Sequence, residues 1–540
     1  MEHDLNANSI FEAFCDAAAT FGTRPFLRAP ATGTNGGAVP PVSWTYGEAR
    51  REVGRLQRLY AAHGLEADAR VAVAFDSRPD VYLHLLALNG LGISVVPVNS
   101  GGTDRDIARI IAHSDAALVV CADEHATRFG ELAGAGCRAV GLTEFCAGAE
   151  RDAAVIPGLE RREAALLYTS GTTGHPKGCM LSNEYFLGMG RWYTGLGGAC
   201  TLTADDRLLT PLPPHHMNAL CVSFMAALLR GACVVQLDRF HPSSWWRTVR
   251  EEGATVIHYL GVMPAILLTL PRSGDDDVGA QVKFGFGAGC DPRHHALFEQ
   301  RFGFPLLEAW SMTETGAGAV TIADREPRHV GERCIGRLAR GSEHRVVDER
   351  GKDVDKGQPG ELWVRARGAD PRKGFFSGYY KDERATREAW AGGWFHTGDV
   401  VREGSGGLLY FVDRRKNIIR RSGENIAAVE VEAVLLAHPL VLNCAVTAVA
   451  DELRGEEVFA LVVPAESATE IEARALVAHC LQQLSYFKAP AYVAFTDRLP
   501  LTASQKVNRA EVRKHGAACV ADSTCFDLRE LKKHRRARTG

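Results

Sequence analysis

The stretch Leu166–Asn183, LLYTSGTTGHPKGCMLSN, decides how the rest of this 540-residue chain is interpreted. An apolar run, Ala164–Tyr168, predicts a buried strand that ends in a loop of hydroxyl-bearing residues and glycines. Glycines let backbone N–H groups approach a ligand closely, hydroxyls donate to phosphoryl oxygens, and Lys177 supplies a mobile positive charge. The loop therefore predicts a polyphosphate site. It is not a Walker A loop, because Lys177 follows Pro176 and precedes Gly178.

The composition is that of an ordinary globular protein with more than one domain. Apolar residues make up 46% of the chain and charged residues 24%, and 62 basic and 65 acidic residues leave a formal net charge of −3. This balance argues against a nucleic-acid binder held by bulk charge. The 14 cysteines contain no CxxC pair and no Cys/His zinc spacing, so we expect reduced thiols.

No targeting or membrane segment is expected. The N-terminal string MEHDLNANSIFEAF is acidic and has no apolar core of a signal peptide. No run approaches the roughly 18 uninterrupted apolar residues of a transmembrane helix. We therefore expect a cytoplasmic protein, monomer or homodimer, that binds no nucleic acid and has no integral membrane association.

Strands and helices alternate on both sides of the loop, which predicts a layered α/β fold. For example, Arg70–Phe75 and Ile93–Val98 have the apolar pattern of buried strands, with a helix over Val81–Gly92 between them. From about Val330 onward, short alternating runs such as Glu361–Arg367 predict a small β-subdomain. The elements predicted after the charge cluster Asp413–Lys416 form a compact α+β unit.

That charge cluster marks the expected domain boundary. We predict a large N-terminal domain at 1–412, a hinge at 413–416 and a small C-terminal domain at 417–520. The last residues, 521–540, end in KKHRRARTG and are expected to be a flexible basic tail.

Seven further motifs follow the loop along the chain. They are PLPPHHMN (211–218), GFGAG (285–289), EAWSMTETG (308–316), GWFHTGD (393–399), DRRK (413–416), RSGENI (421–426) and PLTASQKVNR (500–509). Taken singly, each also fits a turn, a bulge or a solvated charge cluster. Their order and spacing make the set of motifs more specific than any one of them.

Together with the loop, these motifs resemble the adenylate-forming (AMP-binding) superfamily, which includes acyl-CoA synthetases, luciferases and adenylation domains of peptide synthetases. The resemblance spans roughly residues 10–515, and the string DRRKNIIRRSGEN is closest to acyl-CoA ligases of the crotonobetaine/carnitine-CoA ligase type. It implies a large N-terminal domain of two layered α/β halves plus a small β-subdomain, followed by a small mobile α+β C-terminal domain.

The resemblance implies a nucleotide site. Trp310 would stack on adenine, Asp399 and Arg414 would contact the ribose, and Glu314 would hold Mg²⁺, a hard cation that prefers oxygen ligands. The residues implied to bind ATP or AMP are Thr169, Ser170, Gly171, Thr172, Thr173, Lys177, Gly287, Ala288, Gly289, Glu308, Ala309, Trp310, Ser311, Met312, Asp399 and Arg414.

The resemblance also implies catalytic, hinge and acyl-binding residues. The catalytic set is Lys506, Thr313, Glu314 and His216, with Lys506 stabilising the charge that develops during adenylation. Lys416 is the implied hinge residue. The residues implied beside coenzyme A in the thioester step are Arg421, Ser422, Gly423 and Glu424, and those implied for the acyl pocket are His216, Val222, Met225, Gly261, Met263 and Phe286.

The chain departs from the family pattern at three points. His215 stands where an aromatic residue is usual, Trp310-Ser311 stands where Tyr-Gly is usual, and Gln505 replaces the glycine that normally precedes the catalytic lysine. The Trp310-Ser311 departure is expected to reduce the volume of the pocket, and the Gln505 departure is expected to alter the backbone path of the loop before Lys506.

The expected activity is that of an acyl-CoA ligase with ATP, Mg²⁺ and coenzyme A. It would convert a carboxylic acid into an acyl adenylate with release of pyrophosphate, and then transfer the acyl group to coenzyme A. We expect a monocarboxylate of modest size, with branched, cyclic or carnitine-like acids as candidates. Two alternatives stay open: an adenylation enzyme that passes its acyl group to a carrier protein or another acceptor, and a non-catalytic nucleotide-binding relative.

Overall fold

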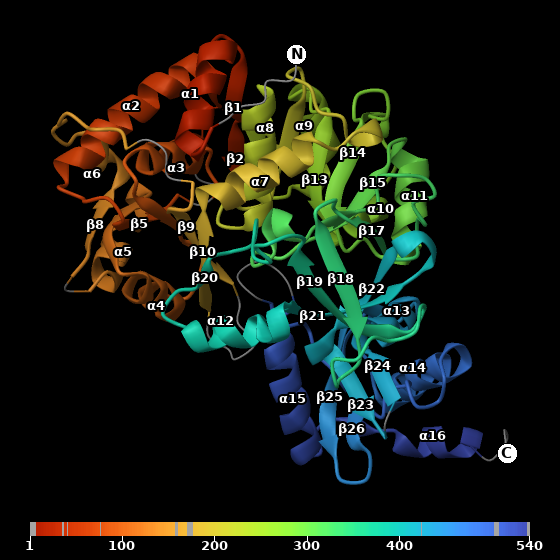
Figure 1. Cartoon of the computed structure of the whole chain (residues 1–540). Helices are drawn as coiled ribbons and strands as arrows, with labels where there is room; N and C mark the ends of the chain where they lie inside the picture. Colours follow the sequence, from red (N-terminus) through yellow and green to blue (C-terminus); the bar gives the residue numbers. More distant parts are fainter. Residues whose placement is uncertain are drawn as a thin grey trace. The chain divides into compact units, whose positions relative to one another are not determined.

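The computed structural model describes residues 7–34, 37–39, 41–75, 77–134, 136–156, 160–169, 176–422, 424–501 and 507–536 (Figure 1). The chain divides into two compact units. Unit 1 consists of Met1–Arg345, Trp363–His396 and Gly404–Tyr410, and unit 2 consists of Val346–Leu362, Thr397–Glu403 and Phe411–Gly540.

The first sheet of unit 1 has seven strands in the order β20-β10-β9-β6-β5-β7-β8. Their bounds are β5 (Arg70–Ala74), β6 (Ser94–Pro97), β7 (Ala116–Cys121), β8 (Arg138–Gly141), β9 (Glu163–Thr169), β10 (Lys177–Ser182) and β20 (Gly378–Tyr379). The strands from β5 to β9 pair in parallel, whereas β10 is antiparallel to both β9 and β20. The parallel strands are buried on both faces, which explains their almost continuous apolar runs.

The second sheet of unit 1 contains a parallel run, β1-β12-β11-β13-β14-β15, which antiparallel β4 extends at one end and β16 and β17 extend at the other. The bounds are β1 (Pro25–Ala29), β4 (Val42–Thr45), β11 (Arg207–Thr210), β12 (Cys233–Gln236), β13 (Val256–Leu260), β14 (Phe284–Ala288), β15 (Leu306–Trp310), β16 (Thr321–Ile322) and β17 (Cys334–Leu338). Because β13, β14 and β15 are parallel, the motifs at 285–289 and 308–316 both emerge from the same edge of the sheet.

Helices cover these sheets. They are α1 (Ile10–Phe21), α2 (Tyr46–Ala62), α3 (Asp80–Gly90), α4 (Asp104–Ser114), α5 (Ala126–Leu132), α6 (Leu142–Cys146), α7 (Asn183–Thr194), α8 (Phe224–Arg230), α9 (Trp245–Glu251), α10 (Val262–Thr269), α11 (Pro292–Phe302) and α12 (Glu383–Ala389). Helices α1, α2 and α3 pack together (Figure 1), and α3 is buried on every side, as its apolar sequence predicts. The interval 32–41 contains the antiparallel pair β2 (Thr32–Thr34) and β3 (Gly37–Val39).

Four longer strands contribute residues to both units. They are β18 (Ser342–Val347), β19 (Pro359–Ala366), β21 (Phe395–Glu403) and β22 (Leu409–Arg414). These strands occupy the interval for which the alternating pattern predicted a β-subdomain.

Unit 2 is built around a six-stranded sheet. Its strands are β23 (Ile418–Arg421), β24 (Glu424–Ala427), β25 (Val441–Asp451), β26 (Gly455–Pro464), β27 (Tyr492–Phe495) and β28 (Phe526–Asp527), and its helices are α13 (Ala428–Leu436), α14 (Glu470–Gln483), α15 (Arg509–Ala521) and α16 (Arg529–Arg536). In Figure 1, α13 and α14 lie on one side of this sheet and α15 lies on the other. One core cluster contains residues of the sheet, α13 and α14, and a second contains residues of the sheet and α15. This unit has the α+β character that the sequence predicted.

The C-terminal segment differs from the expectation of a flexible basic tail. The described part of it forms β28 and α16, and Leu528 is fully buried in the core of unit 2. Leu531 packs against the same core, and Lys532 is only 3% exposed. The expectation relied on the charge of the segment and overlooked the helical spacing of 528, 531 and 532.

Within the described residues, no helix is long and apolar enough to cross a lipid bilayer. All 14 cysteines are free thiols.

Candidate active site

The predicted phosphate loop closes a β-hairpin of unit 1. Strands β9 and β10 are antiparallel, and Thr169 at the end of β9 is directly opposite Lys177 at the start of β10. Both residues are half-buried. The strand pairing therefore fixes the two ends of the loop. Four of the predicted phosphate ligands, Ser170, Gly171, Thr172 and Thr173, lie outside the described residues.

Tyr379 connects Lys177 to Glu314, and no sequence motif predicted this contact. Its hydroxyl donates to Oε1 of Glu314 at 2.9 Å, and the Lys177 ammonium lies 4.7 Å from the centre of its ring. The pairing of β20 with β10 brings Tyr379 to this position, opposite Cys179. Burial and the neighbouring Glu314 carboxylate raise the pKa of Tyr379, so its hydroxyl stays protonated and can donate. The predicted metal carboxylate and the predicted phosphate lysine therefore share one aromatic side chain.

Glu308 holds the backbone of the glycine-rich motif. Its carboxylate is 5% exposed and accepts hydrogen bonds from the Tyr259 hydroxyl at 2.5 Å and from the N–H groups of Gly289 and Cys290 at 2.9 and 3.1 Å. Gly289 has a φ of +78°, a conformation that favours glycine. A Cβ on Gly261 would lie 1.7 Å from the Gly289 carbonyl oxygen, so these two backbone segments touch. Burial raises the pKa of Glu308.

A tight turn after β15 presents the predicted metal and phosphate residues. The Thr315 hydroxyl accepts from the Met312 N–H at 3.0 Å and lies 3.2 Å from the Ser311 hydroxyl. The N–H groups of Thr315 and Gly316 both donate to the Met312 carbonyl at 3.1 Å. This bonding holds the turn in which Thr313 is half-buried and Glu314 is buried. Trp310 and Ala309, at the end of β15, are 6% and 8% exposed.

The predicted acyl-pocket residue Phe286 lies in an aromatic cluster. It pairs with His258 of β13 in register, and its ring centre lies 4.9 Å from His258, 4.6 Å from Tyr193 and 6.1 Å from Trp192. Nδ1 of His258 lies 2.8 Å from Oδ1 of Asn218 and 2.9 Å from the Ser223 hydroxyl, while its Nε2 lies 3.2 Å from the Tyr193 hydroxyl. Burial lowers the pKa of His258 to about 3, so the ring is neutral at physiological pH.

A π-helical segment, Asn218–Ser223, connects the PLPPHHMN motif to α8. The His216 carbonyl accepts a hydrogen bond from the Leu220 N–H at 3.1 Å at the start of this segment. The rings of His215 and His216 lie 4.4 Å apart, with their planes tilted by 57°. Val222 in the segment and Met225 in the first turn of α8 are buried. Such π-helical turns are frequent at functional sites, because they re-aim side chains that a regular helix would point elsewhere.

Met263 does not join the aromatic cluster. It packs in a separate core cluster with Ile257 and Tyr259. Those two residues alternate with His258 along β13, so they point to the opposite face of the sheet. Met263 therefore packs on the face of β13 opposite His258, and its place in the acyl pocket stays a prediction. The same register places Gly287 opposite Tyr259, and a Cβ on Gly287 would lie 2.4 Å from the Tyr259 carbonyl oxygen.

In unit 2, Asp399 and Arg414 form the predicted ribose-binding pair. Asp399 is 2% exposed, and Nε of Arg414 lies 3.4 Å from its Oδ1. Thr397 fixes this part of β21, because its hydroxyl donates to the Leu362 carbonyl at 2.6 Å and accepts from the Asp399 N–H at 3.0 Å.

The predicted hinge follows β22 and is organised by Asp413. This carboxylate is 1% exposed and accepts from the N–H groups of Arg414 and Val429, and from the Asn417 amide. The carbonyl of Lys416 accepts from Arg513 at 2.9 Å. Burial, and then the positive charge of Arg414, lower the pKa of Lys416.

The predicted thioester segment begins at Arg421, the last residue of β23. Arg421 is 5% exposed, and its Nε lies 2.6 Å from Oε1 of Glu457. Ser422 and Glu424 are exposed, and Ser422 has a φ of +51°. Gly423 and Lys506 lie outside the described residues.

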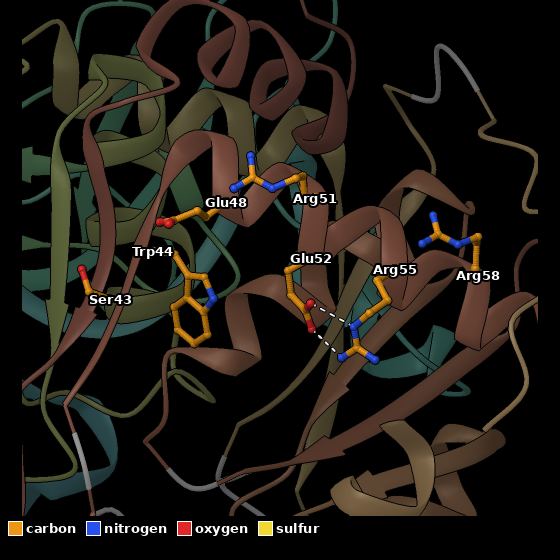
Figure 2. Close-up of a pocket in the computed structure, with 7 residues that line it drawn as sticks. All are labelled: Ser43, Trp44, Glu48, Arg51, Glu52, Arg55 and Arg58. Atoms are coloured by element: carbon orange, nitrogen blue, oxygen red, sulfur yellow. Dashed lines mark hydrogen bonds and ion pairs between the residues drawn. The ribbon is translucent and has the colours of Figure 1, made fainter. Parts of the chain in front are cut away.

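A recess of about 500 Å³ beside α2 is remote in sequence from all of these residues. Figure 2 shows its lining: Ser43, Trp44, Glu48, Arg51, Glu52, Arg55 and Arg58. Glu52 accepts hydrogen bonds from Nε and Nη2 of Arg55 at 2.9 and 2.6 Å, and Arg58 pairs with Glu150 at 2.5 Å. These charges are satisfied by one another, and no predicted site residue lines the recess.

Comparison with known proteins decides the family. A sequence model of the AMP-binding enzyme family matches residues 16–380, and a model of the AMP-binding enzyme C-terminal domain matches residues 430–506. The chain belongs to the AMP-binding enzyme family. The resemblance stated from the motifs is thereby confirmed.

Curated relatives in this family identify the chain as an AMP-forming acid–CoA ligase. The sulfoacetate–CoA ligase of Cupriavidus necator is 33% identical over 537 residues, which cover 95% of this chain and 100% of the relative. The crotonobetaine/carnitine–CoA ligase of Proteus mirabilis is 30% identical over 494 residues, which cover 87% of this chain and 92% of the relative.

Solved structures of AMP-binding enzymes share the fold. ATP-bound MatB from Rhodopseudomonas palustris has a TM-score of 0.80 at 25% identity, over 94% of this chain and 98% of MatB. The o-succinylbenzoate CoA synthetase of Bacillus subtilis, with its acyl-adenylate intermediate, has a TM-score of 0.79 at 23% identity, over 93% of this chain and 97% of the synthetase. The predicted α/β fold, with a large N-terminal domain and a separate C-terminal domain, is confirmed.

Proposed function

We propose that this enzyme activates a modest-sized monocarboxylic acid with ATP and transfers the acyl group to coenzyme A. In the first step a carboxylate oxygen attacks the α-phosphorus of ATP, an acyl–AMP bond forms and pyrophosphate leaves. In the second step the thiolate of coenzyme A attacks the acyl carbonyl carbon and AMP leaves. The observation that carries this proposal is the meeting of Lys177 and Glu314 at Tyr379, because it joins a cation for phosphate to a carboxylate for metal.

The residues around Glu314 fit a magnesium ion. Mg²⁺ binds ATP-dependent sites through one or two protein carboxylates together with phosphate oxygens, and Glu314 offers a carboxylate that Tyr379 orients. Held there, Mg²⁺ would offset the negative charge of the phosphates. In this proposal Lys177 orders the β- and γ-phosphates, Thr313 donates to a phosphate oxygen, and Lys506 stabilises charge on the carboxylate and the α-phosphate.

We infer the character of the acid from the aromatic cluster around Phe286. Phe286, Tyr193, Trp192 and the neutral His258 contain no positive charge. Aromatic faces favour neutral or cationic groups over anions, as in the recognition of quaternary ammonium ligands. We therefore favour an acid whose far end is uncharged, branched or cyclic, or is a carnitine-like cation. The two relatives act on acids with opposite charge at that end, sulfoacetate in one case and crotonobetaine or carnitine in the other.

A panel of acids tests the function. Pyrophosphate release is measured with crotonobetaine, carnitine, branched and cyclic short acids, sulfoacetate and amino acids, each with and without coenzyme A. We expect the largest release with a neutral or carnitine-like acid and acyl-CoA as the product. Release that occurs only with amino acids and needs no coenzyme A would overturn the proposal, and a preference for sulfoacetate would overturn the inference about the pocket.

The role of Lys506 has its own test. Lys506→Ala is expected to abolish acyl-adenylate formation while supplied acyl-AMP is still converted into acyl-CoA, because the lysine acts only in the first step. Lys514→Ala, at an exposed position of α15, is the control. An equal loss in both half-reactions would refute the assignment.

A further inference from the structure

A cation from the C-terminal helix is buried at the centre of unit 2. Lys532 on α16 is 3% exposed, and its ammonium donates to Oε2 of Glu457 at 2.9 Å and to the carbonyls of Ala489 and Phe487 at 2.7 and 3.4 Å. An ammonium has three donors, so all of them are used. Burying a lysine costs free energy unless its charge is paired and hydrogen-bonded, and this lysine meets both conditions.

The other oxygen of the same carboxylate holds Arg421. Nε of Arg421 lies 2.6 Å from Oε1 of Glu457, and Glu457 itself is 2% exposed. The Arg421 guanidinium lies 6.0 Å from the ring centre of Tyr486. One buried carboxylate thus connects the C-terminal helix to the end of β23.

The end of β23 is a strained position. Arg421 is the last residue of β23 to pair, with Glu424 of β24 on one side and Gly455 of β26 on the other. Ser422 follows with a φ of +51°, which side-chain-bearing residues adopt at a cost, and its N–H donates to the Arg454 carbonyl at 2.8 Å. A residue in such a conformation is stable only when neighbouring contacts hold it there. The ion pair of Arg421 with Glu457 fixes the residue before Ser422 and so stabilises the turn.

We propose that α16 is a brace for the thioester step, in which Lys532 holds Glu457, Glu457 holds Arg421, and Arg421 fixes the turn at Ser422. This inference rests on the proposed function, which assigns the turn to the coenzyme A half-reaction. Helix α16 lies beyond residues 430–506, which the C-terminal family model matches. Lys532, Glu457 and Arg421 are positioning residues, because none of them is assigned contact with a reacting atom.

The first test needs no substrate. In full-length Lys532→Met, amide hydrogen exchange of β23 is expected to rise about tenfold or more, while exchange of α13 and β25 stays within about twofold of the parent. Glu530→Gln is the matched control, because Glu530 lies on the same helix and its ion pair with Arg474 is exposed. Unchanged exchange at β23 would overturn the brace, and so would an equal rise throughout unit 2.

The second test separates the half-reactions. With the acid that gives the largest pyrophosphate release, acyl-adenylate formation by Lys532→Met is expected to stay within about twofold of the parent, while conversion of supplied acyl-AMP into acyl-CoA falls about tenfold. Lys532→Arg, which keeps a cation, should restore most of the second rate. A merely structural role would lower both rates equally, and that result would overturn the proposal.

Two controls keep the outcome decisive. If Lys532→Met does not fold, Lys532→Gln replaces it, because an amide still donates to the Ala489 and Phe487 carbonyls while the charge is removed. If the parent enzyme makes acyl-AMP but never acyl-CoA, the proposed function fails, whereas the exchange experiment still reports on the brace.

Discussion

Two buried carboxylates, Glu308 in unit 1 and Glu457 in unit 2, are held in opposite ways. Glu308 accepts from a tyrosine hydroxyl and two backbone N–H groups, whereas Glu457 pairs with a guanidinium and an ammonium. The neutral donors around Glu308 do not compensate the negative charge of its carboxylate with a positive one. Burial therefore raises the pKa of Glu308. The difference teaches that Glu308 shapes a backbone segment that is predicted to bind the nucleotide, whereas Glu457 connects elements that are distant in the sequence.

The largest effect is expected from Glu457→Gln. This change leaves two buried cations facing a neutral amide, and breaking a buried ion pair from one side costs about 3–5 kcal/mol of stability. All eight tryptophans lie in unit 1, so their fluorescence follows that unit, whereas hydrogen exchange of α13 and β25 follows unit 2. We expect a large loss of protection in unit 2 and little change in the fluorescence transition. Equal stability of Glu457→Gln and Glu530→Gln would contradict the role given to the buried pair.

Glu308→Gln should have a smaller effect. The amide keeps the volume and one acceptor, but its NH₂ group must face a backbone N–H of Gly289 or Cys290, and an unsatisfied buried donor costs about 1–3 kcal/mol. Urea unfolding followed by tryptophan fluorescence measures this loss in unit 1. Glu388→Gln, at an exposed position of α12, is the control. If Glu308→Gln lost as much stability as Glu457→Gln, the contrast between neutral and cationic partners would not determine the cost.

The secondary structure and the family could be predicted because both are encoded locally. The helix predicted over Val81–Gly92 is α3 (Asp80–Gly90), and the apolar run before the predicted phosphate loop forms β9. The glycines and hydroxyl-bearing residues near one another in the chain predicted the phosphate loop. Such signals depend on neighbours in the chain, and they need no knowledge of tertiary contacts.

The supporting residues could not be predicted, because they act across long separations. Tyr379 lies 65 residues from Glu314, and Lys532 lies 75 residues from Glu457. The face of the sheet on which Met263 packs could not be predicted either, because periodicity does not say which face of a sheet a following helix covers. A usable signal did exist for α16: two leucines and a lysine at 528, 531 and 532 have the spacing of a helix face that docks on a core.

A third prediction concerns acid stability, and it extends the comparison to a buried group that stays neutral. The pKa of His258 is lowered from 6.5 to about 3 by burial, so its contribution to stability is complete above about pH 6.5 and is lost progressively as the pH falls toward 3. At pH 5 the loss amounts to about 2 kcal/mol for this residue. His258→Gln should therefore weaken the dependence of unit 1 stability on pH between 7.5 and 5, measured by urea unfolding with tryptophan fluorescence. His515→Gln, at an exposed position, is the control, and an unaltered pH dependence in His258→Gln would refute the prediction.

The smallest effect is expected from Tyr379→Phe. This variant tests whether the orientation of Glu314, another buried carboxylate of unit 1, also depends on a neutral donor. The change removes the hydrogen bond to Glu314 but keeps the ring beneath the Lys177 ammonium. Loss of one hydrogen bond to a carboxylate is worth about 1.5 kcal/mol, which corresponds to a roughly tenfold higher Mg²⁺ concentration for half-maximal ATP binding. Calorimetric titration of ATP at a series of Mg²⁺ concentrations, without acid, measures this shift.

Tyr380→Phe is the matched control, because the neighbouring hydroxyl bonds to Asp115 at 2.6 Å instead. We expect its Mg²⁺ requirement to equal that of the parent. Tyr379→Leu, which also removes the ring, should weaken ATP binding at saturating Mg²⁺ as well, since Lys177 then loses its aromatic contact. If Tyr379→Phe and Tyr380→Phe needed the same Mg²⁺ concentration, the turn after β15 alone would orient Glu314. The neutral donors described in unit 1 would then only hold the backbone beside Glu308.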